Sequence, residues 1–119
     1  MSREAAQQVL ESLTAAGALG AVLATRDGLP ALRALKRPVS EDTFSAMAAA
    51  LLGAAEAALA EWSEVRPAHA TIETAELRLV VDGVDTDHIL AAVVPAGADA
   101  RLQTTLAGAA AQMARALRG

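Results

Sequence analysis

Residues 17–29 have the sequence GALGAVLATRDGL, and this stretch decides the fold. Ala18 to Thr25 is apolar at both odd and even positions, which predicts a strand in the interior of a sheet. Asp27-Gly28 comes next and favours a type I′ hairpin turn, because both residues tolerate positive φ angles. The return strand is expected from Pro30 to Arg37. Its three basic residues predict a sheet edge, where charge discourages pairing with another chain.

Helices are predicted on both sides of this hairpin. Ser2 to Ala16 carries an apolar stripe, with Ser2 as N-cap and Gly17 as the end. Glu41 to about Trp62 forms the second helix, with Ser40 as N-cap. Three strands and a last helix follow; their expected ranges are His69 to Thr74, Glu76 to Asp82, His88 to Val94 and Asp99 to Arg118.

Short connections between the last three strands predict an antiparallel meander. If the two strands that are apolar on both faces are neighbours, the five-stranded antiparallel sheet has the order 2-1-5-4-3. Three helices must then be shared between the two faces of the sheet, one on one face and two on the other. The chain is therefore expected to be a single α/β (α+β) domain over residues 1–119.

The helix from Glu41 to Trp62 lacks a polar face over nearly three turns. Its core stripe is predicted to be Phe44, Met47, Ala48, Leu51, Ala55, Leu59 and Trp62. The opposite side should be polar, yet it carries mainly small apolar residues, among them Ala46, Ala49, Ala50, Gly53, Ala54 and Ala57. A helix that is apolar all round is buried all round.

A second copy of the chain could bury this second face, because small residues at three- and four-residue spacings let two helices approach closely. A twofold contact of the helix with itself would be self-complementary. The edge strand His69 to Thr74 adds Ala70, Ile72 and Thr74 to the predicted interface, since the strand holds no lysine, arginine or proline. The alternative remains open that alanine is merely abundant and that this helix face stays hydrated.

The quoted stretch resembles the G-x-x-G-A-v-v-x-x-x-D-G-l signature of the Roadblock family. The alanine-rich segment from Thr43 to Leu59 is similar to the long helix of that family, and the order of elements agrees. The resemblance covers essentially the whole chain. One departure is Ala98 to Leu102, where many members begin the last helix with an Asn-Leu-Gly-like turn.

The resemblance implies a profilin-like sandwich and either a homodimer or a heterodimer with a paralogue, formed through the central helix and an adjoining edge strand. It also implies a regulatory or scaffolding role towards small Ras-like GTPases, and the long helix looks most like that of prokaryotic members. A cytoplasmic location is expected separately, because the N-terminal segment lacks the uninterrupted apolar core of a signal peptide. Two alternatives are a dimerising adaptor for non-GTPase partners and a small-ligand sensor that holds its ligand against the sheet.

Composition argues against several other functions. A net charge of −4 and only 2% aromatic residues disfavour nucleic-acid binding. The absence of cysteine excludes disulfides and thiolate sites. No P-loop or nucleophile-elbow motif occurs, so neither an enzyme nor a cofactor is expected. The longest apolar run, Ala46 to Ala55, is too short to cross a membrane.

The remaining polar candidates are interpreted as structural. His69 and His88 are expected to be solvated or hydrogen-bonded, and His88 with Asp85 and Asp87 is interpreted as a loop cluster rather than a metal site. Arg26 or Arg33 could act as an arginine finger towards a GTPase, but an exposed arginine on a hairpin is more often solvated.

Overall fold

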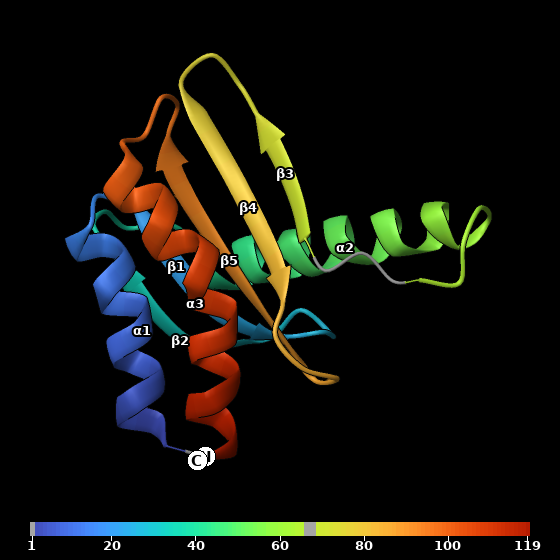
Figure 1. Cartoon of the computed structure of the whole chain (residues 1–119), viewed down its shortest axis with the longest axis horizontal. Helices are drawn as coiled ribbons and strands as arrows, with labels where there is room; N and C mark the ends of the chain where they lie inside the picture. The colour runs from blue at the N-terminus through green and yellow to red at the C-terminus, as the bar shows by residue number, and fades with distance from the viewer. Residues whose placement is uncertain (1, 66–68) are drawn as a thin grey trace.

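The computed structural model describes residues 2–65 and 69–119. In chain order its elements are α1 (Arg3–Ala15), β1 (Gly20–Thr25), β2 (Pro30–Leu35), α2 (Glu41–Ala60), β3 (His69–Glu73), β4 (Leu77–Gly83), β5 (His88–Pro95) and α3 (Ala100–Arg118). The five strands form one antiparallel sheet in the order β2-β1-β5-β4-β3, as predicted. Figure 1 shows this mixed α/β architecture, with both chain ends close together.

Each helix begins at a side chain that caps it. The hydroxyl of Ser2 accepts a hydrogen bond from the Ala5 N–H, and that of Ser40 accepts one from the Thr43 N–H. The Asp99 carboxylate does the same for the N–H of Leu102. These caps satisfy backbone donors that the first helical turn leaves unpaired, so the helix starts follow directly from the sequence.

The first hairpin differs from the predicted type I′ turn. Gly28 has a φ of +93°, but no non-glycine residue in the described ranges has a positive φ, so Asp27 lacks the angle that a type I′ turn requires. The Gly28 N–H donates to the Thr25 carbonyl, and the Thr25 N–H donates to the Leu29 carbonyl, each at 2.9 Å. This is a three-residue loop with a glycine bulge. It brings the turn so close to α2 that a Cβ on Gly28 would lie 2.9 Å from Ala46 Cα.

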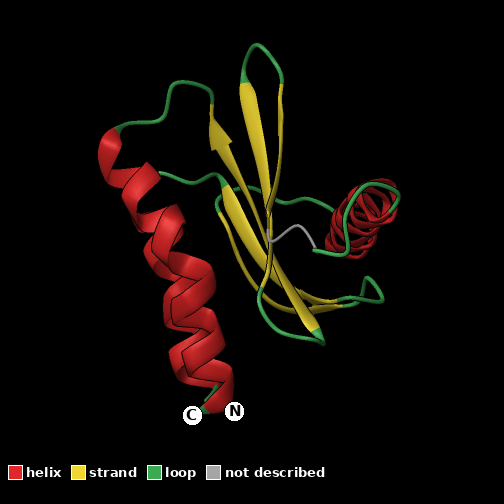
Figure 2. Ribbon diagram, turned by 45° about the vertical axis from the view of Figure 1, so that its right-hand side comes forward, coloured by secondary structure: helices red, strands yellow, loops and turns green. Residues whose placement is uncertain are grey.

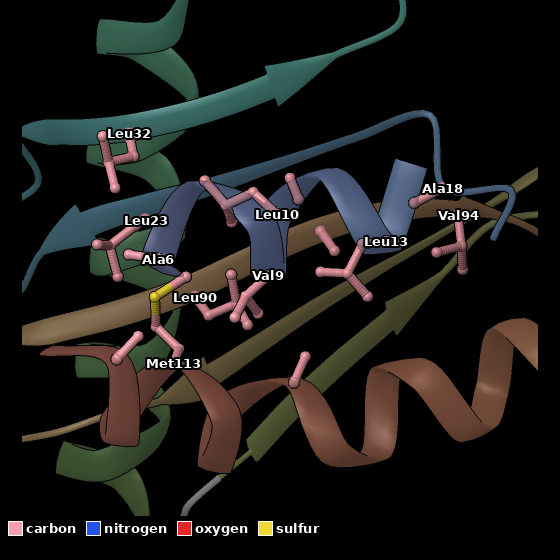
Figure 3. Packing of buried hydrophobic residues seen from close by; sticks show 14 of the residues in the cluster. Ala6, Val9, Leu10, Leu13, Ala18, Leu23, Leu32, Leu90, Val94 and Met113 are labelled. Carbon is pink, nitrogen blue, oxygen red and sulfur yellow. The ribbon is translucent and has the colours of Figure 1, made fainter. Parts of the chain in front are cut away.

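Helices α1 and α3 cover one face of the sheet, and α2 lies on the other (Figure 2). The larger core lies between the helix pair and the sheet (Figure 3). It contains fully buried large side chains from both layers, including Leu10, Leu13, Leu23 and Met113. This half of the molecule is a complete sandwich within one chain.

The core beneath α2 is smaller and contains mainly small side chains. Its buried members are Val22, Ala24, Ala48, Leu52, Val81, Ile89 and Ala91. Apart from Leu52 and Ile89, burial on this face comes from valine and alanine side chains, which remove less apolar area from water than leucine or methionine would. The second face of the sheet is therefore less completely closed than the first.

The predicted core stripe of α2 was wrong in part. The buried residues of α2 are Ser45, Ala48 and Leu52. Phe44, Leu51 and Ala55 are only partly buried, whereas Met47, Leu59 and Trp62 are exposed. The physical reason is that α2 is apolar nearly all round, so its periodicity did not determine which stripe would contact the sheet.

Candidate interaction surface on α2 and the β3 edge

The C-terminal half of α2 extends past β3 and away from the sheet (Figure 1). From Ala57 to Val65 every residue is exposed. The exposed residues include Leu59, Trp62 and Val65, and Trp62 is 88% exposed. Exposed apolar side chains at a projecting helix end are typical of interaction sites, so this overhang is a candidate interaction surface.

The total accessible surface of the chain is larger than expected for a compact monomer of its mass. Its accessible surface is 6736 Å². A monomer of 12.1 kDa is expected to expose about 6,000 Å².

The predicted small-residue interface on α2 divides into two groups. Ala50, Gly53, Ala54 and Ala57 are exposed, and a Cβ on Gly53 would meet no atom within 4 Å. Ala46 and Ala49 are partly buried by the chain itself. Ala46 lies beneath the hairpin at Gly28, and Ala49 packs against the smaller core. The free surface of α2 therefore centres on Gly53.

Strand β3 is an edge of the sheet, and among the described strands it pairs only with β4. Ile72 is half exposed, and Ala70 packs partly against the smaller core on the α2 face. Thr74 lies beyond β3: its N–H donates to the Leu77 carbonyl at 2.8 Å and its hydroxyl accepts from the Leu77 N–H at 3.0 Å. Thr74 therefore closes the β3–β4 hairpin rather than extending the free edge.

A second row of apolar residues crosses the sheet on the α2 face. The strand register aligns its members side by side; in spatial order they are Leu35, Gly20, Val93, Leu79 and Ile72. We call this set the apolar row. The neighbouring row contains Val22, Ala91 and Val81, which α2 buries completely or nearly so, whereas the outer members of the apolar row remain partly or largely exposed.

At one end of the apolar row lies an apolar cleft of about 180 Å³. Its floor and walls come from the row, from the first turns of α2 and from the start of β4; the lining residues are Leu19, Gly20, Leu35, Arg37, Val39, Phe44, Leu77 and Val93. Gly20 helps to open the cleft, because a Cβ there would lie 2.9 Å from Leu35 Cδ2. Neither the cleft nor the apolar row was predicted. The alternation in β4 and β5 is visible in the sequence, but the register that aligns the strands is not.

Both candidate arginine fingers are engaged within the chain. The Arg26 guanidinium lies 3.3 Å from the Glu56 carboxylate on α2 and donates to the Asp85 carbonyl at 3.0 Å. Arg33 pairs with Glu41 at 2.9 Å. Arg26 therefore links both hairpins to α2. Its guanidinium group stabilises the fold and does not extend into solvent.

The histidines are hydrogen-bonded, as predicted. His69 Nδ1 lies 2.7 Å from an Asp82 oxygen, and its Nε2 lies 2.7 Å from the Thr71 hydroxyl. His88 Nδ1 lies 3.0 Å from Asp85. Within residues 2–65 and 69–119, no group of three or more histidine, aspartate or glutamate side chains is placed to hold a metal ion.

Asp85 organises the turn before β5. Its carboxylate accepts hydrogen bonds from the backbone N–H groups of Asp87 and His88, at 2.8 and 2.7 Å. Partial burial raises the pKa of Asp85, but the hydrogen bonds and the nearby His88 lower it more. The net pKa lies below its ordinary value, so the carboxylate is stabilised in its charged form.

Helix α2 is also long and apolar enough to cross a membrane by length and composition, the one such helix in the described part of the chain. Core helices of globular proteins share this property, although only 17% of the most apolar stretch of α2 is buried. The prediction that the chain has no membrane partner therefore remains a prediction. Glu56, midway along the exposed half of α2, would be costly to place in lipid.

The comparisons with known proteins agree with the resemblance noted in the sequence. A family model described as the Roadblock/LC7 domain matches residues 4–94. MglB of Myxococcus xanthus is 14% identical over 99% of this chain and 98% of its own, with a TM-score of 0.89. A structure described as MglB with tetrameric arrangement is 25% identical over 97% of this chain and 89% of its own, with a TM-score of 0.85.

The fold extends to a more distant group. Acanthamoeba castellanii profilin II is 16% identical over 93% of this chain and 94% of its own, with a TM-score of 0.57. At such low identity the similarity shows a shared fold alone. The comparison with curated proteins gave no match.

Proposed function

Because the chain belongs to the Roadblock/LC7 domain family, we propose that it is a homodimeric, non-catalytic interaction module of the cytoplasm that regulates or scaffolds a small Ras-like GTPase. The observation that carries the proposal is the exposed apolar length of α2, which one copy of the domain leaves largely uncovered. A second copy supplies the same surface in return, as a twofold interface requires.

The proposed dimer joins two surfaces that adjoin one another. The exposed stretch of α2 around Gly53 lies against its twin, where the lack of a side chain lets the helices approach closely. The free edge of β3 pairs or packs alongside, with Ile72 contributing apolar area. Helix α2 and strand β3 contact each other within the chain, so a second copy can meet both elements at once.

The GTPase role rests on the family and on the similarity to MglB rather than on a reactive group. The two arginines that could have reached into a GTPase site are held by Glu56, Asp85 and Glu41. A module of this kind acts by binding one nucleotide state of its partner more tightly than the other. It therefore changes the state or the location of the GTPase without donating a catalytic residue.

The test is binding to each small Ras-like GTPase of the same genome, loaded with GDP or with a non-hydrolysable GTP analogue. Calorimetry should give a dissociation constant that differs between the two states by at least about fivefold, the lower range of allosteric coupling. Single-turnover hydrolysis then separates activation, inhibition and tethering. A dimer that binds none of these GTPases in either state would overturn the GTPase role and leave the adaptor alternative.

The ligand-sensor alternative has less support. The apolar cleft against the sheet has a volume of about 180 Å³. Ligand pockets usually span about 300–1,000 Å³. A thermal-shift screen with metabolites would test the ligand-sensor alternative, because a ligand that binds the folded state raises the melting temperature of the protein.

A further inference from the structure

The geometry points to Thr71 as an acceptor for an acyl group from an activated ester or thioester, with His69 as the base and Asp82 as the residue that orients the base. The transfer modifies the chain itself once, so the chain remains an interaction module. Side chains alternate along β3, so Ile72, which the proposed dimer uses, points to the other face of the sheet. The inference therefore goes beyond the proposed function and needs neither the dimer nor the GTPase.

The β3–β4 hairpin places the three side chains in one hydrogen-bonded series. His69 and Thr71 are two residues apart on β3, so they share one face of the strand. Asp82 on β4 is the partner of His69 in the strand register. His69 Nδ1 lies 2.7 Å from Asp82 Oδ1, and His69 Nε2 lies 2.7 Å from Thr71 Oγ1. The register of one hairpin thus aligns a hydroxyl, an imidazole and a carboxylate.

This series determines which nitrogen of His69 carries the proton. The charged carboxylate of Asp82 can only accept, so the Nδ1–H of His69 donates to it. In the neutral imidazole, Nε2 then accepts a hydrogen bond from the Thr71 hydroxyl. The Asp82 side chain is only 15% exposed, so little water competes for its carboxylate. A hydroxyl that donates to an oriented histidine in this way is activated as a nucleophile.

A groove beside Thr71 can hold the acyl donor. It has a volume of about 370 Å³ and lies between α3 and the β3–β4 hairpin. Ligand pockets usually span about 300–1,000 Å³, so a small donor fits. The wall on α3 includes Leu106, Ala107 and Ala110, which give a short acyl chain an apolar surface.

Arg78 lies in the same groove and supplies positive charge. It is two residues from Val80, the register partner of Thr71, and so shares its face of the sheet. Among the described residues, the partner of its guanidinium is the Glu73 carboxylate, to which Nε donates at 2.8 Å. The Nη groups can therefore donate to the oxyanion that forms when the hydroxyl attacks. Donors placed in this way stabilise a tetrahedral intermediate.

The proposed step transfers one acyl group and balances without an oxidant or a reductant. Thr71 Oγ1 forms a bond to the acyl carbon while its proton passes to His69 Nε2. The bond between the acyl carbon and the leaving group then breaks, and the imidazolium gives its proton to the leaving group. The products are an ester of Thr71 and the protonated leaving group, which is a thiol when the donor is a thioester.

The test uses p-nitrophenyl acetate as the donor and locates the acetyl group by peptide mapping. Thr74 is the internal control, because it is exposed on the same hairpin but its hydroxyl contacts the Leu77 backbone instead of a histidine. Thr71 should be acetylated at least about 100-fold faster than Thr74, the lower end of what a positioned general base contributes. Alkaline hydroxylamine should release the label from Thr71, because it cleaves esters but leaves amides such as acetylated Lys36.

Substitutions test the role of each side chain. Thr71→Val keeps a branched strand residue without the hydroxyl, so the label that hydroxylamine releases should disappear, and Thr71→Ser should restore it. Asp82→Asn replaces an obligatory acceptor with an amide that can donate to His69 Nδ1, which favours the wrong tautomer. Acetylation at position 71 should then slow by at least about 100-fold, while circular dichroism shows an unchanged fold.

The matched control for Asp82→Asn is Asp87→Asn, the same chemical change at an exposed side chain in the turn before β5. It should leave the rate of acetylation unchanged. Equal labelling of Thr71 and Thr74 in the unaltered chain would overturn the inference, whether or not each variant folds. A folded Asp82→Asn variant that reacts as fast as the unaltered chain would do the same, and the proposed dimer and GTPase role would stand.

Discussion

Ser45 is the one buried polar side chain of the described core without a hydrogen-bond partner. Its hydroxyl is fully buried on the contact face of α2. An unsatisfied buried group costs about 1–3 kcal/mol. Ser45→Ala should therefore raise the free energy of unfolding by about 1 kcal/mol, measured by urea denaturation.

The control for Ser45→Ala is Ser12→Ala in α1. Ser12 is exposed and its hydroxyl donates to the Val9 carbonyl at 2.6 Å. Both substitutions improve helix propensity equally, so only the first should gain from removing a buried unpaired group. An equal or smaller gain at position 45 would show that its hydroxyl is satisfied in solution.

Asp85 predicts how stability depends on pH. Its folded-state pKa is lowered, so the carboxylate stabilises the fold above the unfolded pKa, which is about 3.9. This stabilisation is lost as the pH falls through the lower folded-state value. Asp85→Ala should cost about 1 kcal/mol at pH 7, the net value of a typical hydrogen bond, and progressively less below about pH 4.

The Asp85→Asn variant separates the effect of the carboxylate charge on stability from the effect of its hydrogen bonds. The amide oxygen can still accept from the N–H groups of Asp87 and His88, but it does not titrate. Chemical denaturation between pH 3 and pH 7 should therefore show a smaller loss than with alanine. If the alanine variant lost the same stability at every pH, the charge of Asp85 would not matter.

At the scale of the element, α2 combines a narrow contact stripe with an exposed remainder. Gly53 lies in the exposed part, where a Cβ would find no atom within 4 Å. Gly53→Arg should leave the single chain folded but abolish the dimer, because the charge would be buried where the two helices cross. Light scattering should report a monomer at concentrations where the unaltered chain is dimeric.

Gln112→Arg on α3 provides the control for Gly53→Arg. Gln112 is exposed on the opposite side of the sheet, so the added charge stays in water. A dimer that survives Gly53→Arg with unchanged stability would place the interface elsewhere.

The strands at the two edges of the sheet differ in chemistry. Strand β2 carries Arg33, and Lys36 and Arg37 follow it, whereas β3 contains no lysine or arginine between His69 and Glu73. Basic edges discourage pairing with another chain. The asymmetry supports β3 as the edge that meets a second copy.

At the scale of the whole molecule, the two cores are unequal. The face covered by α1 and α3 is complete, while the α2 face keeps a partly exposed apolar row. If a second copy completes that face, folding and association are coupled, and the melting temperature should rise with protein concentration. A hundredfold increase should raise it by about 5 °C, measured by scanning calorimetry.

Gly53→Arg should remove this dependence on concentration and leave a melting temperature near that of the dilute protein. A melting temperature that is independent of concentration for the unaltered chain would mean that the domain is stable without a partner. The apolar face would then remain hydrated, which is the alternative that the alanine-rich composition left open.

The sequence by itself determined the order of elements, the order of strands and the positions of the helix starts. Apolar periodicity distinguishes helices from strands, capping residues mark helix ends, and short connections require antiparallel neighbours. These are local properties, so residues 17–29, the apolar strand His88 to Val94 and the caps at Ser2 and Ser40 were enough to predict them. The last helix was expected to begin at Asp99, which is instead its N-cap. The type I′ turn was wrong because the same Asp-Gly pair also fits a glycine bulge.

Only the tertiary structure decided which stripe of α2 contacts the sheet, how far α2 overhangs β3, and where the apolar row and cleft lie. A helix that is apolar on all sides has no periodicity to orient it, so Ser45 and Leu52 rather than Met47 and Leu59 became the contact residues. The apolar row depends on register between strands that are distant in the chain. Register is set by packing across the whole sheet, which no single segment encodes.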